Sequence, residues 1–209
     1  MLFSDPDVAA FIRDNFIAVW ESVRPVPVVE IDFGNGAKIK RTVNGNIATY
    51  ICAPDGRVID IIPGLNAPRA FLEELSDALV LYQASRKATV DTILAYHRAN
   101  QKEPQRYTID HRDMSKRFVE SNLKYVLVPR ETGAVVPKDG STEAALLAAD
   151  SEINRKERKP LIHAILAEKV WHPADLTKRL YKEVLHVDLD DPTLGLVTKA
   201  FDGGAYGAH

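Results

Sequence analysis

The single thiol of the chain limits the sulfur chemistry that it can do. Cys52 is the only cysteine among 209 residues. One cysteine forms no intrachain disulfide and no two-thiol redox couple, and it is too few for a cysteine-based zinc site. The sequence therefore excludes a dithiol oxidoreductase. Cys52 lies between Ile51 and Ala53 in a predicted strand, where burial raises the pKa of a thiol and makes it inert. We expect a core cysteine, and the alternative is a single-thiol redox sensor.

A second set of residues could do metal chemistry, because imidazole and carboxylate groups that converge can hold zinc. No two histidines have the i, i+4 spacing of a helical metal site, so the spacing does not require one. The alternative is that the histidines are structural and the aspartates form turns ahead of Pro192. We expect no metal or cofactor and keep an enzyme site between the two parts of the chain as the alternative. The residues concerned are His163, His172, His186 and the acidic cluster Asp188, Asp190 and Asp191.

The elements that would position these residues follow from periodicity and turn signals. The first part reads as a helix over residues 4–15, an apolar strand over 16–20, a hairpin over 28–43, a strand pair over 47–62 and a helix over 68–86. Pro54-Asp55-Gly56 is the turn of the strand pair. Helical spacing continues over residues 84–100, and further helices are predicted over 142–158, 161–169 and 172–185. These patterns predict an α/β part over residues 1–86 and a mostly helical part over 87–209.

Two local patterns resemble the thioredoxin-like fold family. The first is FIAVW, residues 16–20, which is an apolar strand that ends in Trp20. The second is IATYICAPDGRVIDIIPG, residues 47–64, which is similar to the family's order of cis-proline and threonine, strand, Asp-Gly turn, strand and glycine. The resemblance covers residues 1–86 and implies a central sheet with flanking helices.

The positions that this family uses for thiol chemistry carry other residues. Glu21 and Arg24 stand where the family has its two cysteines, and Ala48 precedes Thr49 where it has its cis-proline. A cis bond before a residue other than proline costs about 3 kcal/mol, so we expect a trans bond before Ala48. The resemblance implies a redox-inactive member that binds an extended partner chain at the end of the first strand. The implied binding residues are Trp20, Glu21, Ser22, Arg24, Ala48 and Thr49.

Composition limits the partners and the compartment. The chain is 45% hydrophobic and 27% charged with a formal net charge of −2, which is typical of soluble globular proteins and gives no electrostatic basis for nucleic-acid binding. No apolar run has the length of about 20 residues that a membrane span needs, and the N-terminus lacks the pattern of a signal peptide. We expect a cytoplasmic protein, or an exported one whose signal has been removed.

These observations favour a protein-binding module over an enzyme. The expected partner is a protein or peptide. The apolar stripe of the last predicted helix, residues 172–185, suits the core and could also serve a homodimer.

Overall fold

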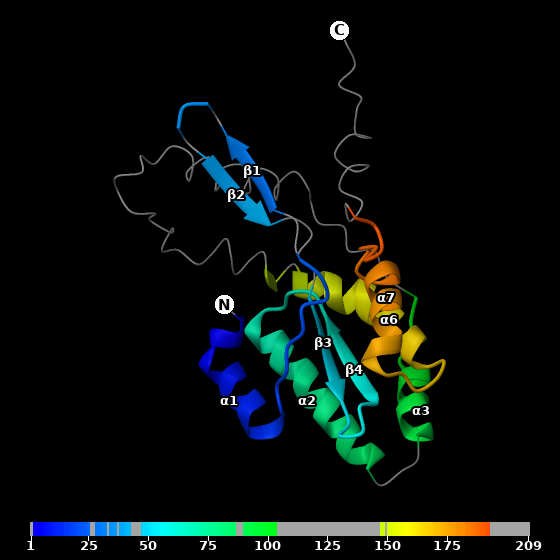
Figure 1. Ribbon diagram of the computed structural model, residues 1–209. Helices are drawn as coiled ribbons and strands as arrows, with labels where there is room; N and C mark the ends of the chain where they lie inside the picture. Colours follow the sequence, from blue (N-terminus) through cyan, green and yellow to red (C-terminus); the bar gives the residue numbers. More distant parts are fainter. Residues whose placement is uncertain are drawn as a thin grey trace.

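The computed structural model describes residues 2–25, 28–32, 34–36, 38–42, 47–86, 90–103, 147–148 and 150–192. These residues form a mixed α/β structure in which helices cover both faces of one antiparallel hairpin (Figure 1). Their peptide bonds are all trans, as expected before Ala48.

The central hairpin consists of β3 (Ala48–Cys52) and β4 (Val58–Pro63), which pair antiparallel from Ala48 opposite Pro63 to Cys52 opposite Val58. The Pro-Asp-Gly turn joins them as predicted, and Gly56 takes a φ of +84°, which a residue with a side chain rarely adopts. Every residue of β4 is buried, because helices pack on both of its faces.

One helical layer consists of α1 (Pro6–Asn15), α2 (Pro68–Ser85) and α3 (Asp91–Ala99). Asp5, one of two residues at this end whose side chains can cap a helix, caps α1, because its Oδ1 accepts hydrogen bonds from the backbone N–H groups of Asp7 and Val8. The helix expected over residues 84–100 is not a continuation of α2: α2 ends at Ser85, and α3 is a separate helix. The core of this layer comprises Val8, Ile51, Ala53, Ile59, Ile62, Phe71, Leu75, Ala78, Leu81 and Ile93.

The opposite layer consists of α6 (Lys159–Leu166) and α7 (Pro173–Glu183). A π-helical turn, Asn154–Arg158, leads directly into α6. Pro160 explains this wider turn, because proline has no N–H to donate and its ring crowds the carbonyl one turn earlier. The core of this layer comprises Val58, Ile61, Ile162, Ile165, Leu166, Trp171, Leu176, Leu180 and Val184. Thus β4 packs against helices of both predicted parts of the chain, residues 1–86 and residues 87–209.

The remaining elements are a 3-10 helix, Leu2–Ser4, and a second hairpin of β1 (Val28–Asp32) and β2 (Lys38–Thr42). The second hairpin forms where the sequence predicts it, and it stands away from the layered body in Figure 1. Of the helix expected over 142–158, residues 147–148 and 150–153 are α-helical and 154–158 form the π-helical turn, while 142–146 and 149 lie outside the described residues.

The buried strand predicted over residues 16–20 is wrong. The segment has no regular secondary structure, and Ile17, Val19 and Trp20 are exposed. Phe16 packs against the core between α1 and α2, but no described residue covers the apolar side chains that follow it. Both sheets of the described residues are two-stranded, and they do not form the central sheet that the thioredoxin-like resemblance implies.

Candidate functional site

Three large apolar side chains face solvent directly after α1. The exposed fractions are 95% for Ile17, 89% for Val19 and 86% for Trp20. Within the described part of the chain, no backbone hydrogen bond engages the N–H and C=O groups of residues 17–20. We call residues 17–20 the exposed segment. A row of apolar side chains of this kind is what a binding partner covers.

Both ends of the exposed segment are fixed. Phe16 packs into the core at one end. Beyond the other end, the guanidinium of Arg24 donates hydrogen bonds to three backbone carbonyls near the C-terminal end of the described chain. Its Nη1 lies 3.3 Å from the oxygen of Leu189 and 2.7 Å from that of Asp191, and its Nη2 lies 3.2 Å from that of Pro192. Arg24 therefore acts as a clamp between two segments that are remote in sequence.

The acidic cluster supports this clamp. Lys178 Nζ lies 2.8 Å from Asp190 Oδ1, and Lys182 Nζ lies 2.9 Å from Asp188 Oδ2, so α7 holds the loop by two ion pairs. The hydrogen bond from Lys182 holds the pKa of the Asp188 carboxyl below its ordinary value. The structure thus places Arg24 and the acidic cluster together, a contact that the sequence did not suggest.

The other predicted binding residues lie in two environments. Glu21 and Ser22 are exposed and extend the surface of the exposed segment. Ala48 and Thr49 are half-buried on β3. Ala48 packs against the small cluster of Tyr181, Leu185 and Val187, which belongs to the stretch that leads into the carbonyls of the Arg24 clamp.

The histidines of the metal hypothesis do not converge. The described residues contain no group of three or more His, Cys, Asp or Glu side chains that could hold a metal ion. His163 hydrogen bonds to His97, and His172 lies beside the Gly56 turn. His186 is exposed, with a φ of +55° at the end of α7.

Cys52 is exposed, so the prediction of a core cysteine is wrong. Side chains alternate along β3, and Ile51 and Ala53 face the α1–α2 core. Cys52 therefore faces the opposite side, where Thr177 of α7 contacts Tyr50 but Cys52 stays exposed. Partial desolvation still raises the pKa of the Cys52 thiol, which disfavours the reactive thiolate.

A buried polar network is the feature that sequence reasoning missed. Lys159 Nζ lies 2.8 Å from Asp60 Oδ2, 2.6 Å from Glu74 Oε2 and 3.2 Å from the carbonyl oxygen of Ile61. Burial opposes the charge of Lys159, but the two carboxylates outweigh it and raise the pKa of Lys159 above its ordinary value. One signal was available: Asp60 interrupts the apolar run VIDIIP, and a carboxylate buried in a strand needs a cation.

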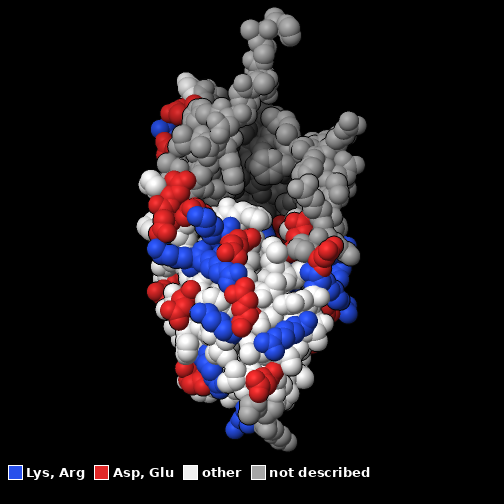
Figure 2. Space-filling model, turned by 90° about the vertical axis from the view of Figure 1, so that its right-hand side faces the viewer, with Lys and Arg blue, Asp and Glu red and all other residues white. Residues whose placement is uncertain are grey.

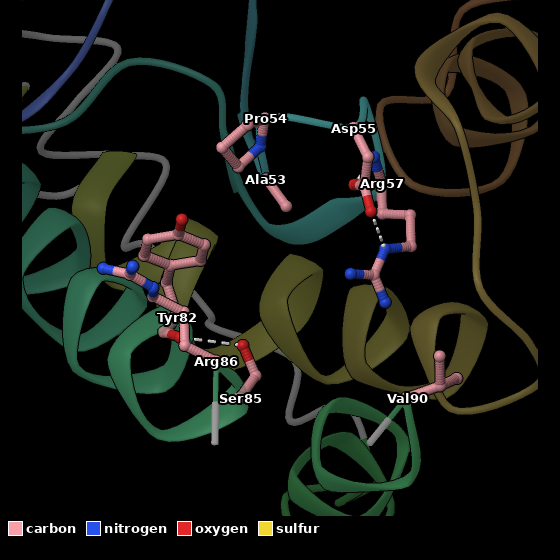
Figure 3. Close-up of a pocket in the computed structure, with 8 residues that line it drawn as sticks. All are labelled: Ala53, Pro54, Asp55, Arg57, Tyr82, Ser85, Arg86 and Val90. Carbon is pink, nitrogen blue, oxygen red and sulfur yellow. Dashed lines mark hydrogen bonds and ion pairs between the residues drawn. The ribbon is translucent and has the colours of Figure 1, made fainter. Parts of the chain in front are cut away.

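A cleft of about 560 Å³ lies at the turn end of the central hairpin. Figure 3 shows the Arg57 side chain reaching from the turn toward the helices, with its Nε bonded to Asp55, while Tyr82 and Arg86 rise from the end of α2. Arg57 is paired with Asp55, and the guanidinium of Arg86 lies over the ring of Tyr82. Its lining comprises Ala53, Pro54, Asp55, Arg57, Tyr82, Ser85, Arg86 and Val90.

The surface on the side of α3, α6 and α7 carries both signs of charge. Figure 2 shows Lys and Arg interspersed with Asp and Glu on this face, without a broad area of one sign. Arg179 is one example, since it pairs with both Glu168 and Glu183. None of the described helices has the length and apolar character that crossing a bilayer requires.

No protein-family model, curated protein or solved structure shows a significant match to the chain.

Proposed function

We propose that the protein is a binding module whose exposed segment docks an extended segment of a partner protein. The observation that carries the proposal is the exposure of Ile17, Val19 and Trp20 on a segment that Phe16 and Arg24 fix at its two ends. Contiguous exposed apolar side chains mark interaction surfaces, and tryptophan is prominent among the residues that dominate binding energy.

The open backbone of the exposed segment indicates how the partner binds. N–H and C=O groups that no described residue engages are available to an added strand, which gains affinity from main-chain hydrogen bonds and specificity from alternate side chains. Ile17 and Val19 are two residues apart and share one side of an extended chain. The partner is therefore an extended peptide with apolar side chains at alternate positions.

The module is redox-inactive in this proposal. The elements β3, β4 and α2 follow one another as strand, Asp-Gly turn, strand and helix, which is part of the order on which the thioredoxin-like resemblance rests. We propose a likeness limited to these three elements. Cys52 is the only thiol of the chain, and Arg24 is engaged as a clamp. This supports binding without thiol exchange.

The test starts from a displayed library of random peptides selected on the intact protein. Affinities of the selected peptides are then measured by calorimetry. The double variant Ile17→Glu/Val19→Glu and the single variant Trp20→Ala are expected to weaken binding at least about 30-fold, since a dominant contact contributes about 2 kcal/mol or more.

The matched control is Val80→Glu, which changes an exposed valine on α2 and should leave the affinity unchanged. Selected peptides that bind the double variant as tightly as the wild type would refute the proposal. Self-association that the double variant abolishes would replace the partner protein by a second copy of this chain.

A further inference from the structure

His97 of α3 and His163 of α6 meet in the interior of the molecule. The two residues are 0% and 7% exposed, and their Nδ1 atoms lie 2.8 Å apart. The second ring nitrogen of His97, Nε2, lies 2.9 Å from the backbone carbonyl oxygen of Ile59 on β4. The pair therefore joins α3 to both α6 and the central hairpin.

These contacts determine where the protons lie. A carbonyl oxygen only accepts hydrogen bonds, so His97 must carry its proton on Nε2 and donate it to Ile59. In the neutral ring Nδ1 of His97 is then an acceptor, and His163 must donate to it from its own Nδ1. The Nε2 atom of His163 is left as an unprotonated base. In this chain of hydrogen bonds, His163 donates to His97 and His97 donates to Ile59, and the donors and acceptors cannot be exchanged.

Added protons act on this chain in two steps. The first proton can bind Nε2 of His163, which places a positive charge in the interior but keeps its Nδ1 donor. The second proton must bind Nδ1 of His97. Two N–H groups then face each other at the 2.8 Å distance, and two cationic rings lie with their centroids 5.1 Å apart. The hydrogen bond between the two helices cannot survive this second step.

Charged groups from every neighbouring element surround the pair. Asp60 on β4 favours protonation of the pair. Glu74 on α2 accepts a hydrogen bond from Lys159 and so offsets part of the positive charge of that lysine. Lys159 on α6 and Lys102, after α3, oppose protonation of the pair. Burial is the largest effect: it lowers the pKa of both histidines, that of His163 to about 4. The rim of the pair is completed by the ring of Tyr96, which contacts both imidazoles.

We propose that the His97–His163 pair is an acid-sensitive latch that holds α3 against α6 and β4 and releases α3 when the pair takes up protons. Release uncovers the ring of His163 and the carbonyl of Ile59. It is independent of the exposed segment and of any partner bound there.

Hydrogen–deuterium exchange of α3 in the intact protein tests the latch. Rates at about pH 7.5 and about pH 5 are corrected for the intrinsic pH dependence of amide exchange. His163 has a pKa of about 4 when packed and about 6.5 when released. The equilibrium constant for opening of α3 should therefore be about 30-fold larger at pH 5 than at pH 7.5. The amides of α2 should change much less. Equal protection of α3 at the two pH values would overturn the proposal.

Two variants separate the latch from general acid sensitivity. In His163→Asn the side-chain amide can still donate to His97 but cannot be protonated, so the part of the rise in α3 exchange that comes from His163 should disappear and only the part that comes from His97 should remain. The exposed His186→Gln is the matched control and should retain the wild-type rise. If His163→Asn does not fold, the NMR titration of the ring protons in the wild type decides. A pKa for His163 at or above 6.5 would overturn the proposal.

Discussion

Replacing Lys159 by methionine removes the cation of the buried polar network while keeping a side chain of similar length. The wild-type ammonium group serves the carboxylates of Asp60 and Glu74 and the carbonyl of Ile61. Without it, the Asp60 side chain, only 2% exposed, retains the backbone N–H of Ile61 as a hydrogen-bond donor. Glu74 is 26% exposed and can turn toward water. The cost is therefore set mainly by Asp60.

Removing one partner of a buried ion pair costs about 3–5 kcal/mol, because an uncompensated charge is left in the interior. We expect Lys159→Met to lower the free energy of unfolding by about that amount, measured by urea denaturation followed by circular dichroism. The double variant Asp60→Asn/Lys159→Met should regain about 2 kcal/mol of the loss, since the stranded charge is gone. A loss below about 1 kcal/mol in the single variant, or strictly additive effects in the double variant, would refute this reasoning.

Three further predictions follow from individual contacts. The pKa of His163 is about 4 in the folded protein and about 6.5 in the unfolded chain, so the unfolded state binds more protons in acid. The free energy of unfolding should therefore fall by about 3 kcal/mol between pH 6.5 and 4. Denaturation at a series of pH values checks this, and a flat profile contradicts it. Arg24→Ala removes three hydrogen bonds to backbone carbonyls and should lower the free energy of unfolding by about 1–2 kcal/mol. The same variant should lower the fluorescence anisotropy of Trp20, and unchanged anisotropy would show that the clamp does not fix the exposed segment. Gly64→Ala should cost about 1–3 kcal/mol in chemical denaturation, because Gly64 has a φ of +63° and an added Cβ would lie 2.8 Å from Asn154 Oδ1; a neutral effect would mean that the π-helical turn yields easily.

Sequence reasoning succeeded where local chemistry decides the backbone. The turn at Pro54-Asp55-Gly56 and the cap at Asp5 are set by residues within a few positions of each other. The central hairpin and α2 were therefore predictable, as was the hairpin of β1 and β2. The same reasoning gave the mixed α/β class.

It failed where the outcome depends on a distant surface. An apolar run is buried only if another element covers it, and the exposed segment has no such cover among the described residues. Cys52 was predicted to be buried because its neighbours are apolar. The alternation of side chains along β3 instead places Cys52 on the face toward α7, and α7 does not cover it at the turn end of the strand.

The candidate site was even less accessible from the sequence. Arg24 is 165 residues from Leu189, and no local pattern links a guanidinium to backbone carbonyls at that separation. His97 and His163 come from separate helices and meet only because both pack against β4. Asp60 alone gave a usable signal, since a charge within an apolar strand requires a partner.

The central claim is that the exposed segment binds an extended partner chain through its backbone. Hydrogen–deuterium exchange of the intact protein, with and without a peptide selected from the library, tests it most directly. The account predicts that the amides of residues 17–20 gain protection on binding, while those of the turn at residues 53–57 stay unchanged. Protection confined to that turn, with the amides of residues 17–20 unaffected, would contradict it.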